Sequence, residues 1–525
     1  MPVKSTAELN PQVSQRFTFI LIVLCLVVAA LLRLSALDLM EYKIDEAVMI
    51  RLVSQVADDG TFLTHGEYSS RGPSHSPLAT YLLAPTWAWA HSYLAVVWLI
   101  ALLNVAAVGV TYWIGQRYLS PRAGLIAAAC MAVSPWMVML SRKIWRPDMM
   151  PLFGALLLAS TLVLVVEGRR RAIFWVCLWG GVVAQIFPTG YLAVGAVLLF
   201  LLLHRPRVSR PALFLGLTVL TILYLPYGIF LAGGGWREFL ALLSPRGGVG
   251  NPSSWVQKIE PIWHLVNLGN FPYLIGETSY YLDAKLGASA LLVYPLATLE
   301  RWGFIAGFGW LIWRMLSPKG ESHLQPVGLI FILWIAFPAV VYLFTPWRPY
   351  PHYYMVILPA PFLILGATVN QGLARLSTGV GSTSRYRGAA GILGLALAGI
   401  ILTQVHFTAT LLSLLRAKGG ASGEYGVSYQ HKVALADYLA KTFGPGCYRL
   451  THEWRPLYGV DVGSEIYDLV RRRVEKRPCP TPAPVQLYLL ETVDRPLSPA
   501  AEARLGPYRR FGPILLYTKA AKHEP

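Results

Sequence analysis

The chain has 525 residues, of which 55% are hydrophobic and only 14% are charged, and its mean hydropathy is +0.49. This composition excludes an ordinary soluble globular protein, in which about a quarter of the residues are charged, and it predicts a polytopic membrane protein. The formal net charge of +18 would suggest a nucleic-acid partner in a soluble protein. Here much of the excess lies in short loops between apolar runs, where it sets orientation, so we expect no nucleic-acid partner.

Apolar runs of membrane-spanning length recur along the chain. The first, from Phe17 to Leu32, follows a short polar tail and lacks a cleavage site of small residues, so we predict a retained span rather than a signal peptide. Glu300 and Arg301 interrupt a later segment and suggest an interfacial helix ahead of the span there. The predicted spans, eleven in all, lie at roughly 17–36, 93–116, 122–140, 150–167, 172–187, 190–204, 211–232, 302–317, 326–345, 353–370 and 389–412.

Basic residues predict the orientation of these spans. If the spans alternate, Arg117 and Arg122, the stretch EGRRR at 167–171 and the stretch HRPRVSR at 204–210 all fall on one side. The positive-inside rule makes that side the cytoplasm, and the N-terminus shares it. The chain is therefore expected in the cytoplasmic membrane, with everything after residue 412 outside.

The polar C-terminal region differs from the rest of the chain. It alternates helix-like segments such as SYQHKVALADYLAKTF with strand-like ones such as VQLYLLET, which is typical of a small α/β domain. We therefore predict a transmembrane region over 1–412, with interfacial helices in the 37–92 loop, and a soluble extracytoplasmic domain over 413–525. Cys447 and Cys479 both lie in this domain, and they are a possible disulfide pair if the domain is outside the cell.

Two turns on the predicted outer side carry more basic and aromatic residues than the orientation rule allows. The turn SRKIWRPD contains Arg142, Lys143 and Arg146. These cations either reach lipid headgroups or form a site for an anion, such as the phosphate of a lipid-linked substrate. A second turn is TPWRPYPHYY. Its Arg348 and His352 are further predicted phosphate ligands. Its tyrosines are expected to contact the acceptor or line a cavity: Tyr350, Tyr353 and Tyr354.

Isolated carboxylates accompany these cations. Asp45 and Glu46 follow the first span directly, and Asp148 follows the basic turn. They either balance charge and cap the next helix, or supply a general base that takes a proton from an acceptor hydroxyl. Neighbouring residues on a helix point about 100° apart, so Asp45 and Glu46 are not expected to share one task.

Several segments together resemble one family of enzymes. These are the acidic pair after the first span, the PLATYLL segment, the stretch TYWIGQRYLSPRAGLIAAACMAVSPWMVMLSRKIWRPDMM and the late RPYPHYYMVILPAPFLILGA. They are similar to segments of bacterial membrane glycosyltransferases of the GT-C fold, in the branch of the dolichyl-phosphate-mannose protein mannosyltransferases and the lipid A aminoarabinose transferase. The resemblance covers roughly residues 15–370 and implies a GT-C fold with about eleven transmembrane helices.

The resemblance also implies a reaction. A sugar would leave a polyprenyl phosphate and join an acceptor hydroxyl of a lipid, glycan or protein, with inversion at the anomeric carbon. Family enzymes use an aspartate of the first outer loop as base, and its matching position is Asp45; Glu46 completes the pair, and a second family acid matches Asp148. The loop from 233 to 288 matches no family motif, so it gives no indication of the acceptor.

A metal site and two other functions stay open. Some relatives in this fold class hold a divalent cation, but His65 and His75 lack the spacing of metal ligands. The rival functions are a transporter or flippase for a lipid-linked sugar, which predicts charged residues at mid-depth in the spans, and a non-catalytic membrane subunit that retains the fold.

Overall fold

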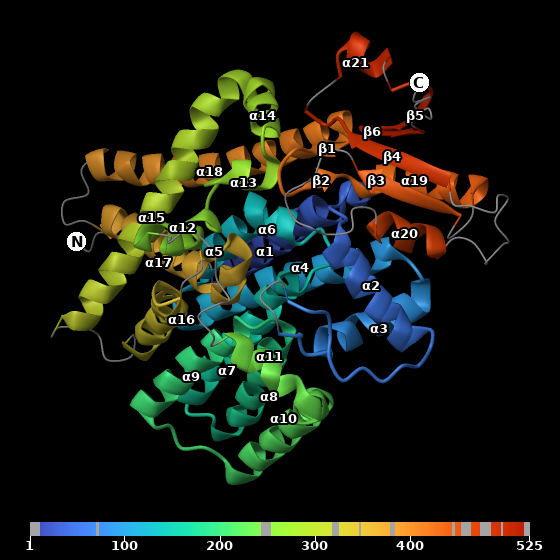
Figure 1. Ribbon diagram of the computed structural model, residues 1–525. Helices are drawn as coiled ribbons and strands as arrows, with labels where there is room; N and C mark the ends of the chain where they lie inside the picture. Colours follow the sequence, from blue (N-terminus) through green and yellow to red (C-terminus); the bar gives the residue numbers. More distant parts are fainter. Residues whose placement is uncertain are drawn as a thin grey trace, which may run out of the picture.

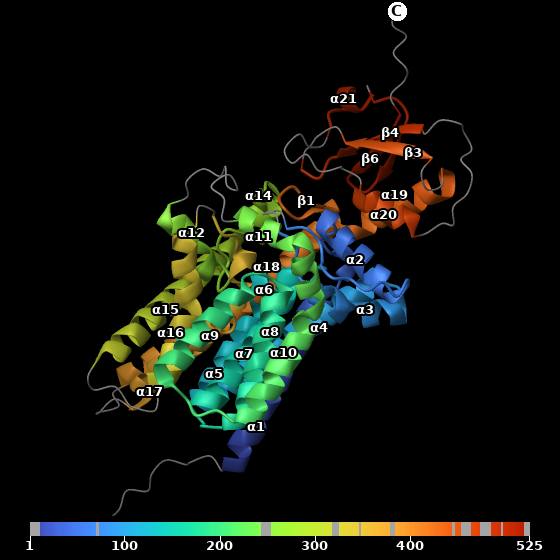
Figure 2. The same cartoon turned by 60° about the horizontal axis from the view of Figure 1, so that its bottom comes forward.

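A computed structural model of the chain describes residues 11–69, 73–242, 254–317, 325–345, 348–378, 384–443, 447–452, 464–472, 485–494, 497–503 and 505–518. Within these ranges it is almost entirely helical, apart from two small sheets near the C-terminus. The helices run side by side in a bundle (Figure 2). The start of α1 lies at one end of this bundle and the C-terminal strands lie beyond the other.

A helix lies at each predicted span. The helices of the bundle are α1 (Pro11–Leu34), α4 (Tyr93–Tyr118), α5 (Pro121–Val133), α7 (Met150–Val165), α8 (Ile173–Ile186), α9 (Gly190–His204), α10 (Arg210–Phe230), α15 (Ala290–Leu316), α16 (Gln325–Leu343), α17 (Ala360–Thr378) and α18 (Ser384–Lys418). Among the described residues, seven helices are long and apolar enough to cross a membrane, or eight if one bent pair counts as a span. The predicted fold class, a polytopic helical membrane protein with a small C-terminal α/β unit, is confirmed (Figure 1).

Local sequence explains where two of these helices begin and how closely they pack. The side chain of Ser92 accepts a hydrogen bond from Ala95 N at the start of α4, and Ser120 does the same for Ala123 N at the start of α5. Gly115 of α4 lies against Gly124 of α5, where a Cβ atom on Gly115 would come within 2.4 Å of the Gly124 Cα. Small residues thus let these two backbones touch inside the membrane.

Three predicted spans are wrong in their bounds. The span predicted at 122–140 is divided at Ser134 into α5 and the short helix α6 (Pro135–Leu140). Glu300 and Arg301 do not divide an interfacial helix from a span, because α15 runs unbroken through both. The Glu300 side chain is 1% exposed, and one of its carboxylate oxygens accepts a hydrogen bond from Gln404 of α18 inside the bundle. The predicted span at 353–370 instead begins with the 3₁₀ turn η7 (Pro351–Ile357), which meets α17 at an angle of 65°.

Short helices at the end of the bundle nearest the strands connect its spans. The loop between α1 and α4, called the first outer loop after its predicted side, holds η1 (Leu37–Leu39), α2 (Ile44–Ala57) and α3 (Leu78–Ala90), at the positions predicted for interfacial helices. The remaining short elements at this end are α6 (Pro135–Leu140), η2 (Arg146–Met149), the π-helical η4 (Leu231–Gly235), α11 (Trp236–Leu242), α12 (Trp255–His264), α13 (Phe271–Ile275), α14 (Thr278–Leu286) and η6 (Gly287–Ser289). The short element η3 (Arg170–Ala172) joins α7 to α8 at the other end.

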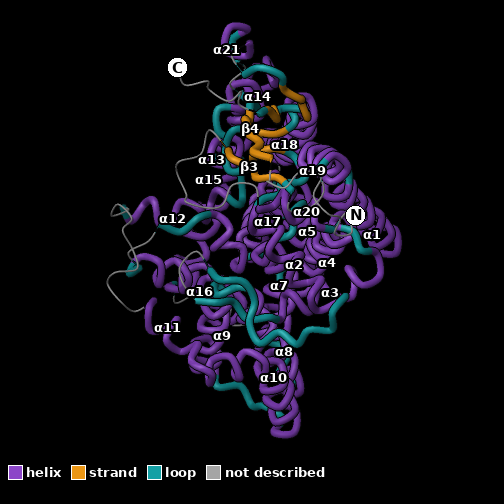
Figure 3. Tube along the Cα trace, turned by 45° about the vertical axis from the view of Figure 1, so that its right-hand side comes forward, coloured by secondary structure: helices purple, strands orange, loops and turns teal. Residues whose placement is uncertain are grey.

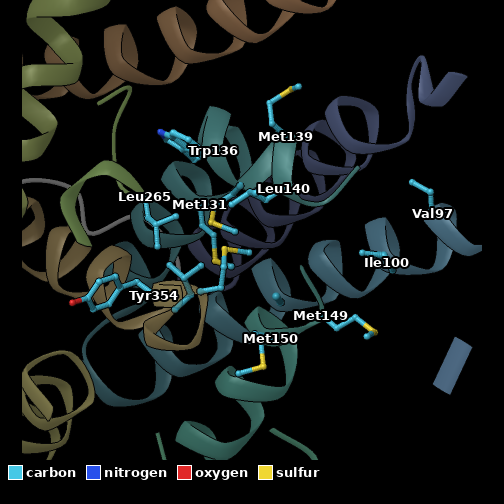
Figure 4. Close-up of a cluster of buried hydrophobic side chains, with 14 of the residues drawn as sticks. Val97, Ile100, Met131, Trp136, Met139, Leu140, Met149, Met150, Leu265 and Tyr354 are labelled. Carbon is cyan, nitrogen blue, oxygen red and sulfur yellow. The ribbon is translucent and has the colours of Figure 1, made fainter. Parts of the chain in front are cut away.

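The hydrophobic core continues from the bundle to this end. Buried Val97 and Ile100 of α4, Met131 of α5 and Trp136 of α6 belong to it, together with Met150 at the start of α7 (Figure 4). The Trp136 ring nitrogen donates to Gly269 O at 2.9 Å, which ties the loop after α12 to α6. The turn between α6 and α7 is therefore anchored on packed side chains and presents its polar residues from a fixed base.

The C-terminal region forms a small α/β unit (Figure 3). A hairpin of β1 (Gly420–Ala421) and β2 (Gly426–Val427) follows α18. Beyond it, the strands stand in the order β3-β4-β6-β5, with β3 parallel to β4 and the other pairs antiparallel. The elements are α19 (Tyr429–Thr442), β3 (Tyr448–His452), α20 (Ser464–Arg471), β4 (Val485–Glu491), α21 (Pro499–Ala503), β5 (Tyr508–Phe511) and β6 (Ile514–Tyr517).

The last long helix ends six residues later than the predicted domain boundary at 412, because α18 continues to Lys418. The region after it packs against the first outer loop, where α20 contacts α2 (Figure 1). Cys447 is disulfide-bonded, while Cys25, Cys130 and Cys177 are free. Its predicted partner, Cys479, lies outside the described residues, so that pairing stays a prediction.

Candidate functional site

Three segments far apart in the sequence meet at the end of the bundle nearest the C-terminal unit: the start of α2, the turn between α6 and α7, and the turn η7. The second segment joins the other two in space: Lys143 Nζ lies 3.3 Å from Glu41 Oε2, three residues before α2, and the Trp145 ring contacts His352 of η7. Lys143 Nζ lies 3.9 Å from the centroid of the Trp145 ring, and that centroid lies 4.3 Å from the centroid of His352 in η7. The predicted grouping of the two basic turns on one face is therefore present in the structure.

The two acids at the start of α2 do different things. The backbone N–H of Lys43, the N-cap residue, donates to Glu46 Oε2 at 2.8 Å, so Glu46 is the acid that caps this helix. It is 1% exposed. Burial, then the nearby Glu41 carboxylate, raise the pKa of Glu46 to about 7, although Lys143 and Lys43 act in the opposite direction. Capping is one of the two roles predicted for this pair, and the capping bond is made by Glu46 and not by Asp45.

Asp45 takes no part in the capping bond, and the residue is exposed. Desolvation by the surrounding protein nevertheless raises the pKa of the Asp45 carboxyl, although Lys143 and Lys43 act in the opposite direction. An exposed carboxylate with a raised pKa, set beside two cations, has the properties of a general base that can reach a bound hydroxyl. Asp45 also lies within electrostatic range of the 142–148 turn, as the sequence prediction requires.

Lys143 is the central cation of the cluster. Its side chain is buried, and Nζ lies 3.3 Å from Glu41 Oε2. Burial alone would lower its pKa, but Glu41, then Asp148 and Glu46, outweigh that effect, so the pKa of Lys143 is raised and the ammonium stays charged. A charged donor held in a dry position is suited to binding an anionic group.

Asp148, in the turn η2, is fully buried beside Lys143. Its main-chain carbonyl accepts a hydrogen bond from Asn104 Nδ2 at 2.7 Å, which fixes the turn. Neither carboxylate oxygen of Asp148 has a hydrogen-bond partner among the described residues. Buried carboxyl groups are almost always hydrogen-bonded, so Asp148 has hydrogen-bonding capacity that the described residues leave unused.

Arg142, a predicted phosphate ligand, holds the end of the first span instead. Its guanidinium donates to the main-chain oxygens of Leu32, Arg33 and Ala36 at 2.9, 3.2 and 2.7 Å. Leu32 and Arg33 belong to the last turn of α1, whose carbonyls lack helical partners, and Ala36 follows that helix and also accepts from Leu39 N. Because these hydrogen bonds go to backbone oxygens and occupy the guanidinium, we do not assign Arg142 to the phosphate.

Arg146, another predicted phosphate ligand, is also fully engaged. It is 1% exposed and forms a two-pronged ion pair with Glu67, and it donates to Ser76 O at 2.7 Å. This pair fastens the first outer loop to the turn between α6 and α7. His75 lies against it, and burial, then Arg146, lower the pKa of His75 to about 4.

The residues predicted in the second turn divide into two groups. His352 lies next to Trp145, and Tyr350 and Tyr353 contact His352, at centroid distances of 5.8 and 4.4 Å. Arg348 and Tyr354 point elsewhere. Arg348 pairs with Glu260 of α12, and Tyr354 is buried and donates to Lys258 O. The site therefore contains His352, Tyr350 and Tyr353, whereas Arg348 and Tyr354 help to hold α12 against η7.

Sequence reasoning missed five residues of this cluster, the fifth being Trp145. Glu41 and Lys43 form an ion pair two residues before the acidic pair, at 2.5 Å, and Lys43 also reaches Glu424 at 3.6 Å. Tyr273 of α13 stacks on Tyr350, with centroids 5.4 Å apart. The alternating charges of EYKIDE were a signal for the first two residues. Nothing local marks Tyr273 or Glu424, because they reach the site only through folding.

The acids of the cluster do not fit a divalent metal. Within the part of the chain that the structure describes, no three His, Cys, Asp or Glu side chains stand close enough to hold one ion. Glu41 is paired with lysines and Glu67 with Arg146, as described above, while Glu46 is occupied by its cap. His65 stacks on Phe230 at 4.4 Å. The divalent cation left open by the sequence therefore has no donor set among these residues, and we derive no chemistry from one.

Glu46 gives this site a pH-dependent stability. Its pKa lies above the ordinary glutamate value in the folded protein, so the folded state binds a proton more tightly and stability falls as pH rises from about 4.5 to about 7. Glu46→Gln keeps an oxygen for the capping bond and removes the buried charge. We expect it to raise Tm by about 2–4 °C at pH 8 and by less at pH 5. Thermal unfolding at the two pH values checks this; an equal shift at both would contradict it.

Fold and site together define a class: a polytopic membrane protein with an acid–cation site where its first outer loop, a mid-chain turn and a late turn converge. The chain has the fold of the GT-C membrane glycosyltransferases, and the predicted resemblance is thereby confirmed. Residues 74–230 match the family model described as dolichyl-phosphate-mannose-protein mannosyltransferase. None of the curated proteins matches the chain.

Solved structures support the fold. ArnT from Cupriavidus metallidurans in the apo state is 14% identical, with a TM-score of 0.55, over 96% of this chain and 98% of that one. The same protein bound to undecaprenyl phosphate is 12% identical, with a TM-score of 0.51, over 97% and 98%. The archaeal oligosaccharyltransferase AglB from Archaeoglobus fulgidus, in complex with an inhibitory peptide and a dolichol-phosphate, is 12% identical, with a TM-score of 0.54, over 98% and 75%.

Proposed function

We propose that the protein is a glycosyltransferase that moves a sugar from a polyprenyl phosphate to an acceptor hydroxyl at the outer face of the cytoplasmic membrane. The observation that carries this proposal is the arrangement of Asp45, Lys143 and Asp148: an exposed acid with a raised pKa, a buried ammonium and a buried carboxylate whose oxygens have no described partner. The matches to a mannosyltransferase family model and to structures holding undecaprenyl phosphate or dolichol-phosphate support the donor class.

Each residue of this arrangement has a role in a single displacement. Asp45 takes the proton of the acceptor hydroxyl, whose oxygen forms a bond to the anomeric carbon. The bond from that carbon to the phosphate oxygen breaks, and its electron pair leaves with the polyprenyl phosphate. Lys143 stabilises the charge that develops on the phosphate. Attack opposite the leaving group inverts the anomeric carbon, and Asp148 accepts hydrogen bonds from hydroxyls of the donor sugar.

The aromatic residues around His352 suit a sugar. Tyr350, Tyr353 and Tyr273 present ring faces beside carboxylates, and pyranose rings bind to such combinations of apolar faces and acceptors. His352 lies within electrostatic range of Lys143 and Lys43, which places it on the phosphate side of the site. The acceptor is a lipid, glycan or protein carrying a hydroxyl. The C-terminal unit then lies outside the cell and the N-terminus in the cytoplasm.

A binding experiment tests the donor class. The purified protein in nanodiscs is titrated with undecaprenyl phosphate and, separately, with undecaprenol, which lacks the phosphate. We expect undecaprenyl phosphate to bind at least about tenfold more tightly, and Lys143→Gln to remove most of that difference, because a charged donor to phosphate is worth roughly 1.5–3 kcal/mol.

Two results would count against the proposal. Equal affinity for the phosphate and the alcohol would show that the site does not recognise phosphate. A phosphate preference that survives in Lys143→Gln would place the phosphate elsewhere. Turnover is then measured with undecaprenyl-phosphate mannose, glucose and arabinose in the presence of a cell-envelope extract, and the fastest of the three serves as donor in the kinetic tests below.

A further inference from the structure

The segment that leads into α2 is bound by the C-terminal part of the chain at every residue from Asp38 to Lys43. The contacts in order are Arg416 to Asp38 at 3.2 Å, the Tyr425 hydroxyl to Leu39 O, Tyr429 N to Met40 O at 3.0 Å, a bridge of Ser428 with Glu41, Lys432 Nζ to Tyr42 O at 2.7 Å, and Lys43 Nζ to Glu424 O at 2.6 Å. The residues that bind this segment, 416–432, run from the end of α18 into α19. Asp45 follows only two residues later.

These contacts differ in strength. Asp38 and Arg416 are both exposed, so that pair contributes little. Lys432, by contrast, is 4% exposed, donates to the Tyr42 carbonyl and pairs with Glu465 at 3.1 Å. A buried ammonium is stable only where such partners are in place, and charge-assisted bonds of this kind are the strong ones. The Lys432 contact is therefore the strongest of the contacts that hold this segment.

The same C-terminal unit also holds the helix itself. Asp468 of α20 lies 3.6 Å from Arg51 of α2, and it accepts a hydrogen bond from the hydroxyl of Tyr93 at the start of α4. The Tyr42 ring packs edge-on against Tyr93 and Tyr429, at centroid distances of 5.5 and 5.4 Å. The backbone before α2 and the outer face of α2 thus both rest on residues beyond the last span.

We propose that the C-terminal unit is a positioning element of the transfer site, and that Lys432 is a positioning residue for Asp45, acting through the Tyr42 carbonyl. The inference rests on the proposed function, in which Asp45 is the base. Lys43 is the N-cap of α2, so the Lys432 contact one residue earlier sets where the first turn of the helix, and with it the Asp45 carboxylate, stands. A displacement of about 1 Å at a reacting group costs on the order of 100-fold in rate.

The test is a double-mutant cycle. Lys432→Met removes the ammonium and keeps most of the side-chain volume, and we expect kcat to fall about 10- to 100-fold with KM for the donor changed less than about threefold. In an Asp45→Asn background the same change is expected to have almost no further effect, because the residue it positions is already gone. Lys441→Met, an exposed lysine at the end of the same helix, is the matched control and should leave kcat unchanged.

Two additional variants and a second readout separate positioning from folding. Lys432→Arg keeps the charge and a donor and should recover part of kcat. Tyr425→Phe, which removes only the hydroxyl that binds Leu39 O, should lower kcat with the same non-additivity and keeps the test available if Lys432→Met does not fold. Hydrogen exchange of the amides of residues 45–49 should speed up in Lys432→Met, while exchange in α4 does not.

The outcomes distinguish this inference from the proposed function. If Lys432→Met and Tyr425→Phe lower kcat by the same factor in the wild-type and Asp45→Asn backgrounds, or leave it unchanged, the positioning role is wrong. If Asp45→Asn itself turns over at the wild-type rate, the base assignment is wrong, and the inference falls with it. Loss of kcat that is confined to the wild-type background, together with faster exchange at 45–49, supports both.

Discussion

Asp45→Asn is expected to lower kcat for transfer from the chosen donor by about 10²–10⁴-fold, the contribution typical of a general base. Asparagine has nearly the same shape but cannot take the proton of the acceptor hydroxyl. KM for the lipid donor should change little, because Asp45 acts on the acceptor and not on the phosphate.

The role of Asp45 as base also predicts how the activity of the wild type depends on pH. Activity needs the Asp45 carboxylate, whose pKa is raised. As the pH is lowered, kcat/KM of the wild type should therefore begin to fall at a higher pH than in an enzyme whose base is an aspartate of ordinary pKa.

The control for this variant is Asp59→Asn. Asp59 is exposed and lies just beyond the C-terminal end of α2, so the same chemical change there should leave kcat within about twofold, as expected for a surface substitution. Wild-type turnover by Asp45→Asn would remove Asp45 as the base. A wild-type protein that binds undecaprenyl phosphate but transfers none of the three sugars would instead favour a non-catalytic subunit that retains the fold.

The spans were predictable because the bilayer fixes both the length and the composition of a crossing helix. α4 and α9 begin and end within two residues of their predicted positions. The prediction failed where tertiary contacts override composition. Glu300 breaks the apolar pattern of its segment, yet Gln404, about a hundred residues away, donates to one of its oxygens and α15 continues. The turn η7 is apolar enough to extend α17 but bends away from it beside Trp145.

The sequence predicted where the candidate site lies, but it did not predict which of its charged residues are occupied by other parts of the protein. Charges that violate the positive-inside rule mark the turn between α6 and α7, and the acidic pair marks the start of α2. Which cations are free to bind a ligand depends on distant partners. Arg142 is occupied by carbonyls of α1, and Arg146 by Glu67, while Lys143 between them keeps its charge within the cluster of acids. No local pattern distinguishes these three residues.

The second large effect is expected from Lys143→Gln. Lys143 is a buried cation that pairs with Glu41 and lies within electrostatic range of Asp45 and Asp148, and glutamine keeps hydrogen-bonding capacity while removing the positive charge. Loss of one preorganised donor to a developing anion costs about 10²–10³-fold in kcat, and we expect a loss of that size. The fold should survive, because Glu41 still pairs with Lys43 at 2.5 Å after the change. The measurement is single-turnover release of undecaprenyl phosphate from the chosen donor, with circular dichroism and thermal unfolding as checks on the fold.

Arg348→Gln is the matched comparison, because the sequence predicts a phosphate role for both residues and the structure separates them. Arg348 is exposed and pairs with Glu260 of α12, and a surface pair of this kind contributes roughly 1 kcal/mol or less. Its loss should therefore change single-turnover release less than about threefold. A loss at Arg348 as large as that at Lys143 would move the departing phosphate toward α12. It would also remove the reason for placing Asp45 opposite the leaving group, since the base and the phosphate must stand on either side of one anomeric carbon.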